Sequence, residues 1–170
     1  MTNITLKNIA KKTAIAATLI SGLSAGTVSA DTFNAALSLV EPIALTQTTQ
    51  MNLGAILATD SNTCTLAALG ARTGTGCFGP TSGTLAAIGV SGTAGQQVDI
   101  ALTNGASAAS ELTFAPSLLD NGQGATTLTG VTLQAAHSLS LGGTLTVANG
   151  ALAITNNVTS VNYQVNVTYQ

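Results

Sequence analysis

The chain has 170 residues, of which only 6% are charged and 3% aromatic, and its formal net charge at pH 7 is −2. All three lysines lie within the first 12 positions, so Arg72 is the only basic residue of the remaining chain, against six acidic ones. Proteins that bind nucleic acid or an anionic membrane surface need a basic patch. This composition therefore excludes nucleic-acid binding and disfavours binding to such a membrane.

Residues 1–30 have the three parts of a removable export signal. A positively charged segment precedes the short apolar run 14–23, and small residues follow at 28–30. The apolar run is shorter than the roughly 20 residues that a membrane-spanning helix needs. We therefore expect a signal peptide at 1–30 and an exported chain that begins at Asp31 and is not inserted in a membrane. Its remaining length of about 140 residues suits one domain.

The first predicted strand covers residues 32–40. One of its faces consists of apolar residues, namely Phe33, Ala35, Leu37 and Leu39. Pro42 ends this strand, because proline has no N–H group to donate to a neighbouring strand. We accordingly divide the exported chain into an N-terminal extension, residues 31–41, and a domain, residues 42–170.

Short predicted strands then recur about every ten residues along the chain. They cover residues 43–46, 51–57, 85–90, 96–102, 112–115, 128–134, 139–147 and 151–154. Val98, Ile100 and Leu102 are expected to point inward from one of them. Gly142-Gly143 indicates a bulge, and the Ala-rich segment 105–111 has room for one turn of helix. Many short strands separated by turns predict an all-β fold, either a sandwich or a barrel.

The last predicted strand covers residues 161–170 and has the clearest alternation in the chain. One face is apolar and consists of Val161, Tyr163, Val165, Val167 and Tyr169. The other face carries Asn, Gln and Thr side chains. Because successive side chains of a strand point to opposite faces, this strand should have one side in the protein and the other in water.

The two cysteines, Cys64 and Cys77, are separated by 13 positions. An exported chain meets an oxidising compartment, which favours a disulfide. A loop of this size would add about 3 kcal/mol to stability. The alternative is a metal-binding pair, but His137 is the only histidine and lies far away in the sequence.

The sequence offers little chemistry for catalysis. His137 is a candidate general base, but the chain has no Gly-x-Ser-x-Gly motif to accompany it. Residues 60–62 and 120–122 are oxygen-rich and suit either a calcium ion or ordinary Asx turns, and we favour the turns. The glycine-rich segment 70–79 lacks the Gly-Lys-Ser/Thr of a phosphate-binding loop. We expect no enzyme activity, no cofactor and no metal site.

The C-terminus resembles that of pilins assembled by the chaperone–usher pathway, which end in an alternating strand with an aromatic residue next to last, as Tyr169 is here. Such pilins also begin with a short alternating extension and often carry one disulfide in their first half. In addition, residues 39–45, 51–56, 88–92 and 141–147 and the Tyr-Gln ending are similar to a bacterial family known only as a domain of unknown function, whose exported members look like fimbrial subunits.

These resemblances imply an immunoglobulin-like β-sandwich that lacks one strand and is completed by a donor strand from a neighbouring subunit. Phe33, Ala35, Leu37 and Leu39 would be the donor residues. The acceptor groove would be lined partly by Val161, Tyr163, Val165, Val167 and Tyr169. Partners would be identical subunits in a head-to-tail polymer, a periplasmic chaperone and an outer-membrane usher.

The function implied is that of a structural subunit of a fimbria on the surface of a Gram-negative-type bacterium, which supports adhesion or biofilm formation. The alternative is a self-contained secreted or periplasmic β-sandwich that acts as an adhesin-like binding module. Alternating strands at both ends of the domain suit either function. A fimbrial subunit would exchange them between copies, whereas a self-contained module would pair them within one chain.

Overall fold

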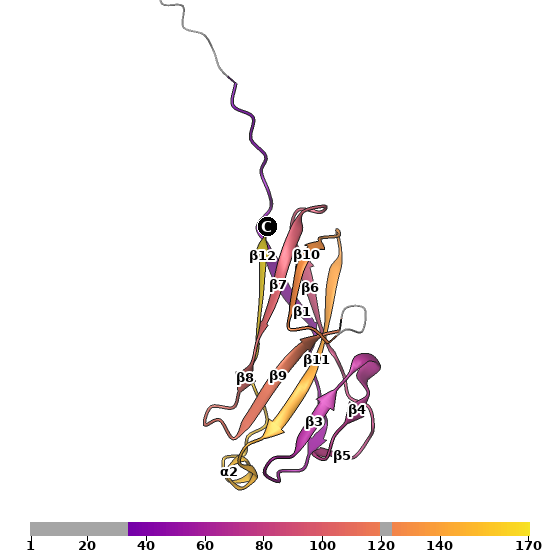
Figure 1. Ribbon diagram of the computed structural model, residues 1–170, viewed down its shortest axis with the longest axis vertical. Helices are drawn as coiled ribbons and strands as arrows, with labels where there is room; N and C mark the ends of the chain where they lie inside the picture. Colours follow the sequence, from indigo (N-terminus) through magenta and orange to yellow (C-terminus); the bar gives the residue numbers. More distant parts are fainter. Residues whose placement is uncertain (1–33, 120–123) are drawn as a thin grey trace, which may run out of the picture. The chain divides into compact units, whose positions relative to one another are not determined.

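The computed structural model describes residues 34–119 and 124–170 (Figure 1). The chain divides into two units, residues 1–38 and residues 39–170, and the second unit contains all the strands of the described residues. The predicted signal peptide therefore lies outside the described residues. Within the described part of the chain, no helix has the length and apolar character needed to cross a membrane.

The second unit consists mainly of short strands. The strands are β1 (Ala44–Thr49), β2 (Ala55–Ile56), β3 (Thr63–Leu66), β4 (Arg72–Thr73), β5 (Cys77–Phe78), β6 (Ala86–Ser91), β7 (Gln97–Thr103), β8 (Gly105–Ala106), β9 (Leu112–Leu118), β10 (Thr127–Thr132), β11 (His137–Val147) and β12 (Gln164–Tyr169). The helices are the 3-10 helix η1 (Ala68–Gly70) and the α-helix α2 (Gly150–Thr155).

The strands form antiparallel sheets, which confirms the predicted all-β fold. The largest sheet has the order β1-β6-β11-β3-β4, and β9 pairs with β11 and with β8. A second sheet has the order β10-β7-β12, and β2 pairs with β5 in a small third sheet. The long strand β11 pairs with β6 along its first half, whereas its second half lies between β3 and β9.

Side chains from the two larger sheets share one hydrophobic core. The core includes Ala86, Ile88 and Val90 of β6, Val98, Ile100 and Leu102 of β7, and Leu139 and Leu141 of β11. The prediction that β7 points Val98, Ile100 and Leu102 inward is confirmed, because all three are at most 9% exposed. Each of these large side chains contributes about 1.5–3 kcal/mol to stability through its burial.

Gly142 and Gly143 do not form the predicted bulge. The pairing of β11 with β9 runs from Leu141 to Val147 without a shift in register. A Cβ atom on Gly142 would lie 2.1 Å from the carbonyl oxygen of Leu66 in β3, and one on Gly143 would lie 2.4 Å from that of Ala115 in β9. The two glycines therefore allow neighbouring backbones to approach β11 closely from both sides.

Two short segments differ from their predicted structure. The predicted strand at 151–154 is part of the helix α2, because the Asn149 side chain accepts a hydrogen bond from the Leu152 N–H at 3.0 Å and caps the first turn. The predicted helical turn at 105–111 instead contains β8, which pairs with β9. In each case a contact formed in the fold, and not the local apolar pattern, determines the structure.

Other differences concern where strands begin and end. The strand β9 continues through Pro116 to Leu118, whereas the sequence predicted its end at residue 115. The sequence predicted no strand in the segment around Cys64 and Cys77, which contains β3, β4 and β5. Residues 34–43, the described part of the predicted first strand and the turn after it, contain no strand. A strand needs a hydrogen-bonding neighbour, and these residues pair with none in the described chain.

Candidate functional site

An open groove of about 790 Å³ lies between two segments that are far apart in the sequence. One wall is formed by the end of β1 and the residues after it, namely Gln47, residues 50–54 and Ile56. The other wall is formed by residues 158–163 and by Val165 of β12. The floor consists of Ile88, Leu112, Phe114 and Leu145 from the largest sheet.

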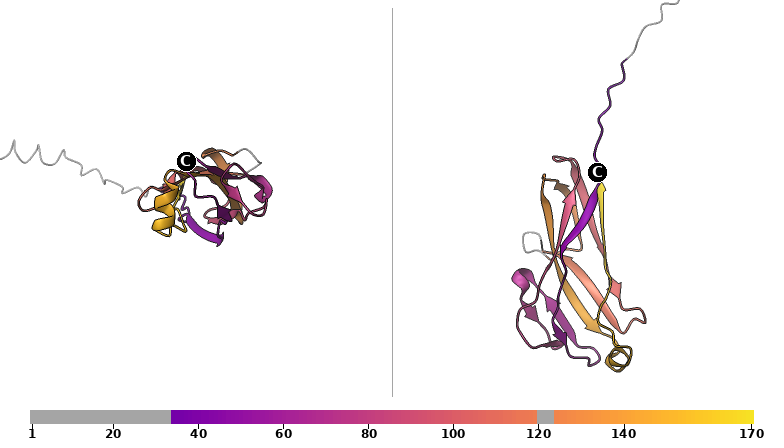
Figure 2. Two further views of the ribbon diagram at one scale, coloured as in Figure 1. Left: turned by 90° about the horizontal axis from the view of Figure 1, so that it is seen from below. Right: turned by 180° about the vertical axis from the view of Figure 1, so that it is seen from behind.

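Both walls include the edge of a sheet. In the described part of the chain, β1 pairs with β6 alone, and β12 pairs with β7 alone. Each strand therefore has one edge whose N–H and C=O groups bond to no other strand. Figure 2 (right) shows that β1 and β12 lie close together at the end marked C and diverge toward the other end of the domain.

The walls of the groove carry both polar and apolar side chains, and the apolar ones are only partly covered. Met51, Leu53, Ile56, Val158, Val161, Tyr163 and Val165 are all half-buried. The floor beneath them is almost completely buried, since Phe114 is 1% exposed and Leu145 is 4% exposed. The Tyr163 ring lies against Phe114, with ring centroids 5.8 Å apart. A groove with an apolar floor, walls of mixed polar and apolar side chains and two free strand edges suits an extended peptide segment.

The five predicted groove residues on the last strand all face inward, but they divide into two groups. Val161, Tyr163 and Val165 line the groove. Val167 and Tyr169 do not line the groove, and like Tyr163 and Val165 they pack against the hydrophobic core. The alternation of the sequence thus identifies the inward side of the strand, while the fold determines which inward residues remain accessible.

Three hydrogen bonds connect Glu41, Thr93 and Tyr169, none of which lines the groove. The Tyr169 hydroxyl accepts a hydrogen bond from the Thr93 N–H at 2.8 Å and donates one to the Glu41 carbonyl oxygen at 2.7 Å. The Glu41 N–H donates to the Thr93 Oγ1 at 2.6 Å. We call Glu41, Thr93 and Tyr169 the tyrosine bridge. It joins the end of β12 to the residues just before β1.

The family model described as a domain of unknown function, DUF4402, matches residues 43–169. The chain belongs to this family. The matched region includes both walls and the floor of the groove, as well as Thr93 and Tyr169 of the tyrosine bridge. Comparison with curated proteins and with solved structures found no match.

The predicted donor residues lie on the N-terminal side of the region that the DUF4402 model matches. Phe33 lies outside the described residues. Ala35, Leu37 and Leu39 are exposed, and the two leucines are 76% and 87% exposed. Exposed leucines spaced two residues apart are unusual on a protein surface unless another molecule covers them.

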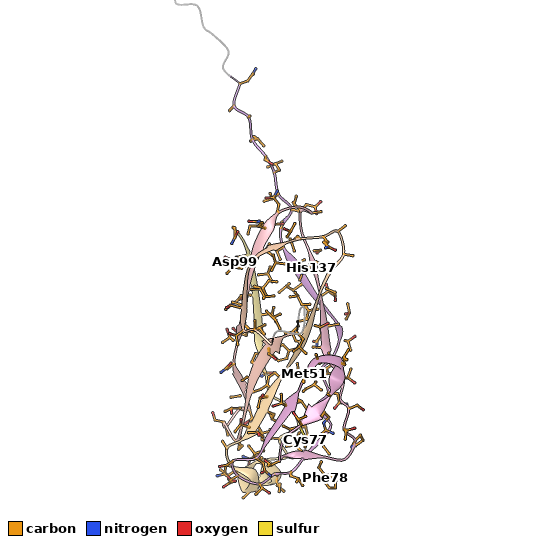
Figure 3. The ribbon with its side chains drawn as sticks, turned by 45° about the vertical axis from the view of Figure 1, so that its right-hand side comes forward. Met51, Cys77, Phe78, Asp99 and His137 are labelled. Carbon is orange, nitrogen blue, oxygen red and sulfur yellow. A yellow bond between two sulfur atoms is a disulfide. The ribbon has the colours of Figure 1, made fainter. Side chains whose placement is uncertain are left out.

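The predicted disulfide between Cys64 and Cys77 is confirmed. In β3, Cys64 lies opposite Leu145 of the groove floor. In β5, Cys77 lies opposite Ile56 of the groove wall. The disulfide therefore links the sheet that carries the floor to the segment that forms one wall. Figure 3 shows Met51, Cys77 and Phe78 on the same half of the domain, away from Asp99 and His137.

Arg72 supports the same wall and was missed as a functional residue by the sequence interpretation. Its side chain is only 6% exposed. The guanidinium donates hydrogen bonds to the carbonyl oxygens of Ala55 at 2.6 Å, Pro80 at 2.5 Å and Phe78 at 3.3 Å. The sequence does single out Arg72 as a lone basic residue among many Gly and Thr residues. It does not show that the side chain is buried, so the supporting role could not be predicted.

Among the residues that the structure describes, Glu111 is the other buried charged one, at 1% exposed. Its carboxylate accepts hydrogen bonds from the Ser107 hydroxyl at 2.8 Å and from the Asn156 side-chain N–H at 2.5 Å. These hydrogen bonds lower the pKa of Glu111, and the one from Ser107 has the largest effect. The backbone N–H groups of Ala148 and Asn149 donate to the Glu111 carbonyl oxygen. Glu111 thus joins the turn before β9 to the segments on either side of α2.

The candidate residues for catalysis and metal binding lie apart from one another. His137 begins β11 and lines a shallow hollow of about 320 Å³, and its Nε2 is buried without a hydrogen-bond partner in the described structure. Asp60 accepts a hydrogen bond from the Gly150 N–H at 2.7 Å, while residues 120–122 lie outside the described residues. Over residues 34–119 and 124–170, no three His, Cys, Asp or Glu residues form a metal-binding group.

Proposed function

We propose that this protein is a structural subunit of a bacterial surface fimbria that polymerises by donor-strand exchange. In this proposal, residues 32–40 of one copy fill the groove of the next copy. The observation that carries it is the groove itself, whose two walls include sheet edges that no strand covers in the described chain. An inserted strand would satisfy the free N–H and C=O groups of either wall.

The groove and the extension agree in length and in chemical character. Residues 158–165 of the groove wall, if fully extended at about 3.3 Å per residue, would extend over about 23 Å. The apolar face of the extension, from Phe33 to Leu39, extends over about 20 Å on the same basis. The side chains on this face would point to the groove floor, while those of Asn34 and Ser38 would point to water.

The exposed state of the extension also supports the proposal. A subunit that displays Leu37 and Leu39 together with an open groove would aggregate if it remained free. Export through the periplasm would therefore require a chaperone to cover the groove and an usher to guide the exchange. Contacts between the extension of one copy and the groove of the next are head-to-tail and do not close, so they produce a filament.

The alternative function is a self-contained binding module. The groove volume of about 790 Å³ lies within the range of small-molecule pockets. Such a module would use the groove for a ligand and would not need its extension. The two functions therefore differ in what removal of the extension does.

Electrophoresis of cell-surface material in detergent, with and without boiling, tests the proposal. The wild-type chain should give a ladder of multimers that collapses to one band on boiling, and deletion of residues 32–40 should abolish the ladder. Leu37→Asp and Ser38→Asp form a matched pair, because they introduce the same charge on opposite faces of the extension. We expect Leu37→Asp to abolish the ladder and Ser38→Asp to preserve it.

A single monomer band for the wild-type chain in both lanes would contradict the proposal and support the binding module. A ladder that persists without residues 32–40 would show that the copies associate through another surface. Equal behaviour of the Leu37→Asp and Ser38→Asp chains would show that the alternation of the extension does not direct its binding.

A further inference from the structure

The extension has two grooves available to it, that of its own chain and that of another copy. Its own groove is always present at high effective concentration, because the two belong to one molecule. A subunit that fills its own groove cannot join a filament. Polymerisation by strand exchange therefore needs a feature that disfavours self-insertion.

Self-insertion requires the chain to reverse direction between residues 40 and 44. β1 begins at Ala44 and runs from the tyrosine bridge toward the groove wall at Gln47. An extension that enters the groove of its own chain would lie beside β1 as a hairpin, with Glu41, Pro42 and Ile43 at the turn. Pro42 cannot donate a hydrogen bond to such a turn, so the turn depends on its neighbours.

The tyrosine bridge occupies the backbone groups that this turn would use. The Glu41 N–H bonds to the Thr93 Oγ1, and the Glu41 carbonyl oxygen accepts from the Tyr169 hydroxyl. Thr93 lies in the turn between β6 and β7, and Tyr169 is the last residue of β12. Glu41 is therefore held by segments outside the groove wall formed by β1.

We propose that the tyrosine bridge keeps the extension out of its own groove and thereby directs it to a second copy of the chain. Tyr169 and Thr93 act here as positioning residues, since neither lines the groove. This inference rests on the proposed function, because it concerns which groove the same donor strand fills. Insertion into a second copy leaves the bridge intact, whereas self-insertion breaks the hydrogen bonds of Glu41.

The test compares closed monomers with polymers. The full-length gene is expressed, and the exported product is purified, unfolded with its disulfide intact and refolded at a series of protein concentrations. Size-exclusion chromatography with light scattering then measures the monomer fraction. Tyr169→Phe and Thr93→Val each remove hydrogen bonds of the bridge, and we expect each to raise the ratio of closed monomer to polymer about threefold to tenfold.

Two control variants separate the bridge from general effects of substitution. Thr93→Ser retains the hydroxyl oxygen and should behave as the wild-type chain does. Thr132→Val makes the same change as Thr93→Val at an exposed position of β10 and should leave the ratio unchanged. Circular dichroism and thermal unfolding establish that each variant is folded before the ratios are compared.

A binding measurement distinguishes positioning from damage to the groove. In chains that also carry Leu37→Asp, whose own extension is disabled, a labelled peptide of residues 31–41 is titrated and its Kd is measured. We expect Tyr169→Phe to leave this Kd unchanged, because the hydroxyl does not line the groove. A Kd weakened as much as polymerisation would overturn the inference and assign Tyr169 a structural role in the groove.

The remaining outcomes separate this inference from the proposed function. If the wild-type chain polymerises through residues 32–40 while Tyr169→Phe and Thr93→Val leave the monomer ratio unchanged, the inference is wrong and the proposed function stands. If the wild-type chain does not polymerise at any concentration, the proposed function is wrong and the inference is overturned with it.

Discussion

The two halves of the unit formed by residues 39–170 are stabilised in different ways. In the half that contains the tyrosine bridge, β6 and the first part of β11 belong to one sheet and β7 to another (Figure 1). Their apolar side chains pack into one buried core. In the half that contains the groove, β9, β3 and the second part of β11 form one sheet, and its inner face is covered by the groove walls. The buried residues Arg72 and Glu111 and the disulfide accompany this second half.

This difference shows how a small domain can keep its structure where one sheet has no second sheet packed against it. Where two sheets face each other, hydrophobic burial is sufficient. Where a second sheet is missing, a covalent link and hydrogen bonds from buried polar groups hold the segments in place. The groove half can therefore keep its shape before any strand fills it, which a binding surface requires.

The largest loss of stability is expected for Leu139→Ala in the hydrophobic core. Leu139 is 0% exposed, so its truncation should lower the free energy of unfolding by about 3–4 kcal/mol. The matched change in the groove half is Leu53→Ala, which removes the same atoms and should cost only about 1 kcal/mol because Leu53 is half-buried and lines the open groove. Urea unfolding of both variants measures the difference. Equal losses would show that the groove half is packed as tightly as the core.

The second largest loss of stability is expected when the disulfide is removed. Replacing Cys64 and Cys77 together by alanine should lower the free energy of unfolding by about 3 kcal/mol. Because the disulfide joins the groove floor to its wall, hydrogen exchange should become faster at Ile56 and Leu145 than at Ile100 of the core. Uniform acceleration across all three positions would mean that the two halves unfold as a single unit.

A smaller effect is expected from the cap of α2, which lies in the groove half. Asn149→Ala removes the side-chain oxygen that accepts from the Leu152 N–H, and this should cost about 1 kcal/mol. Asn149→Ser retains a capping oxygen and should be close to neutral. Thermal unfolding of the two variants tests this. A similar loss for both would indicate that Asn149 acts through some contact other than the cap.

The sequence predicted the core half better than the groove half, for a physical reason. In β7, the large apolar residues Val98, Ile100 and Leu102 alternate with smaller or polar residues because one face packs on a second sheet, and that alternation is visible in the sequence. In α2, a six-residue segment of mainly small and apolar residues suits a strand or a helix equally well. The choice depends on the Asn149 cap and on Asp60, which is 90 positions away from its partner Gly150.

The candidate site shows the same limit on a smaller scale. Val165 and Val167 have identical places in the alternation of the last strand and both pack against the core, but only Val165 also lines the groove. A sequence pattern reports which side of a strand is apolar, but what covers that side depends on distant segments. The role of Arg72 is hidden for this reason, since its three carbonyl partners come from residues 55, 78 and 80.

The smallest expected effect is a pH dependence of stability that arises from Glu111 and should differ between the two halves. Hydrogen bonds from Ser107 and Asn156 lower its pKa from the ordinary value of 4.5 in the folded protein. The ionised form is therefore favoured by folding, and its contribution to stability is present above pH 4.5 and is lost as the pH falls through the lowered pKa. In acid, the protection factors for hydrogen exchange, which are corrected for the intrinsic pH dependence of exchange, should fall first in β9, next to Glu111, and later in β7. Glu111→Gln should remove this difference, and Ser107→Ala should reduce it. If β7 and β9 lose protection together in the wild-type chain, the buried carboxylate does not stabilise the groove half separately from the core.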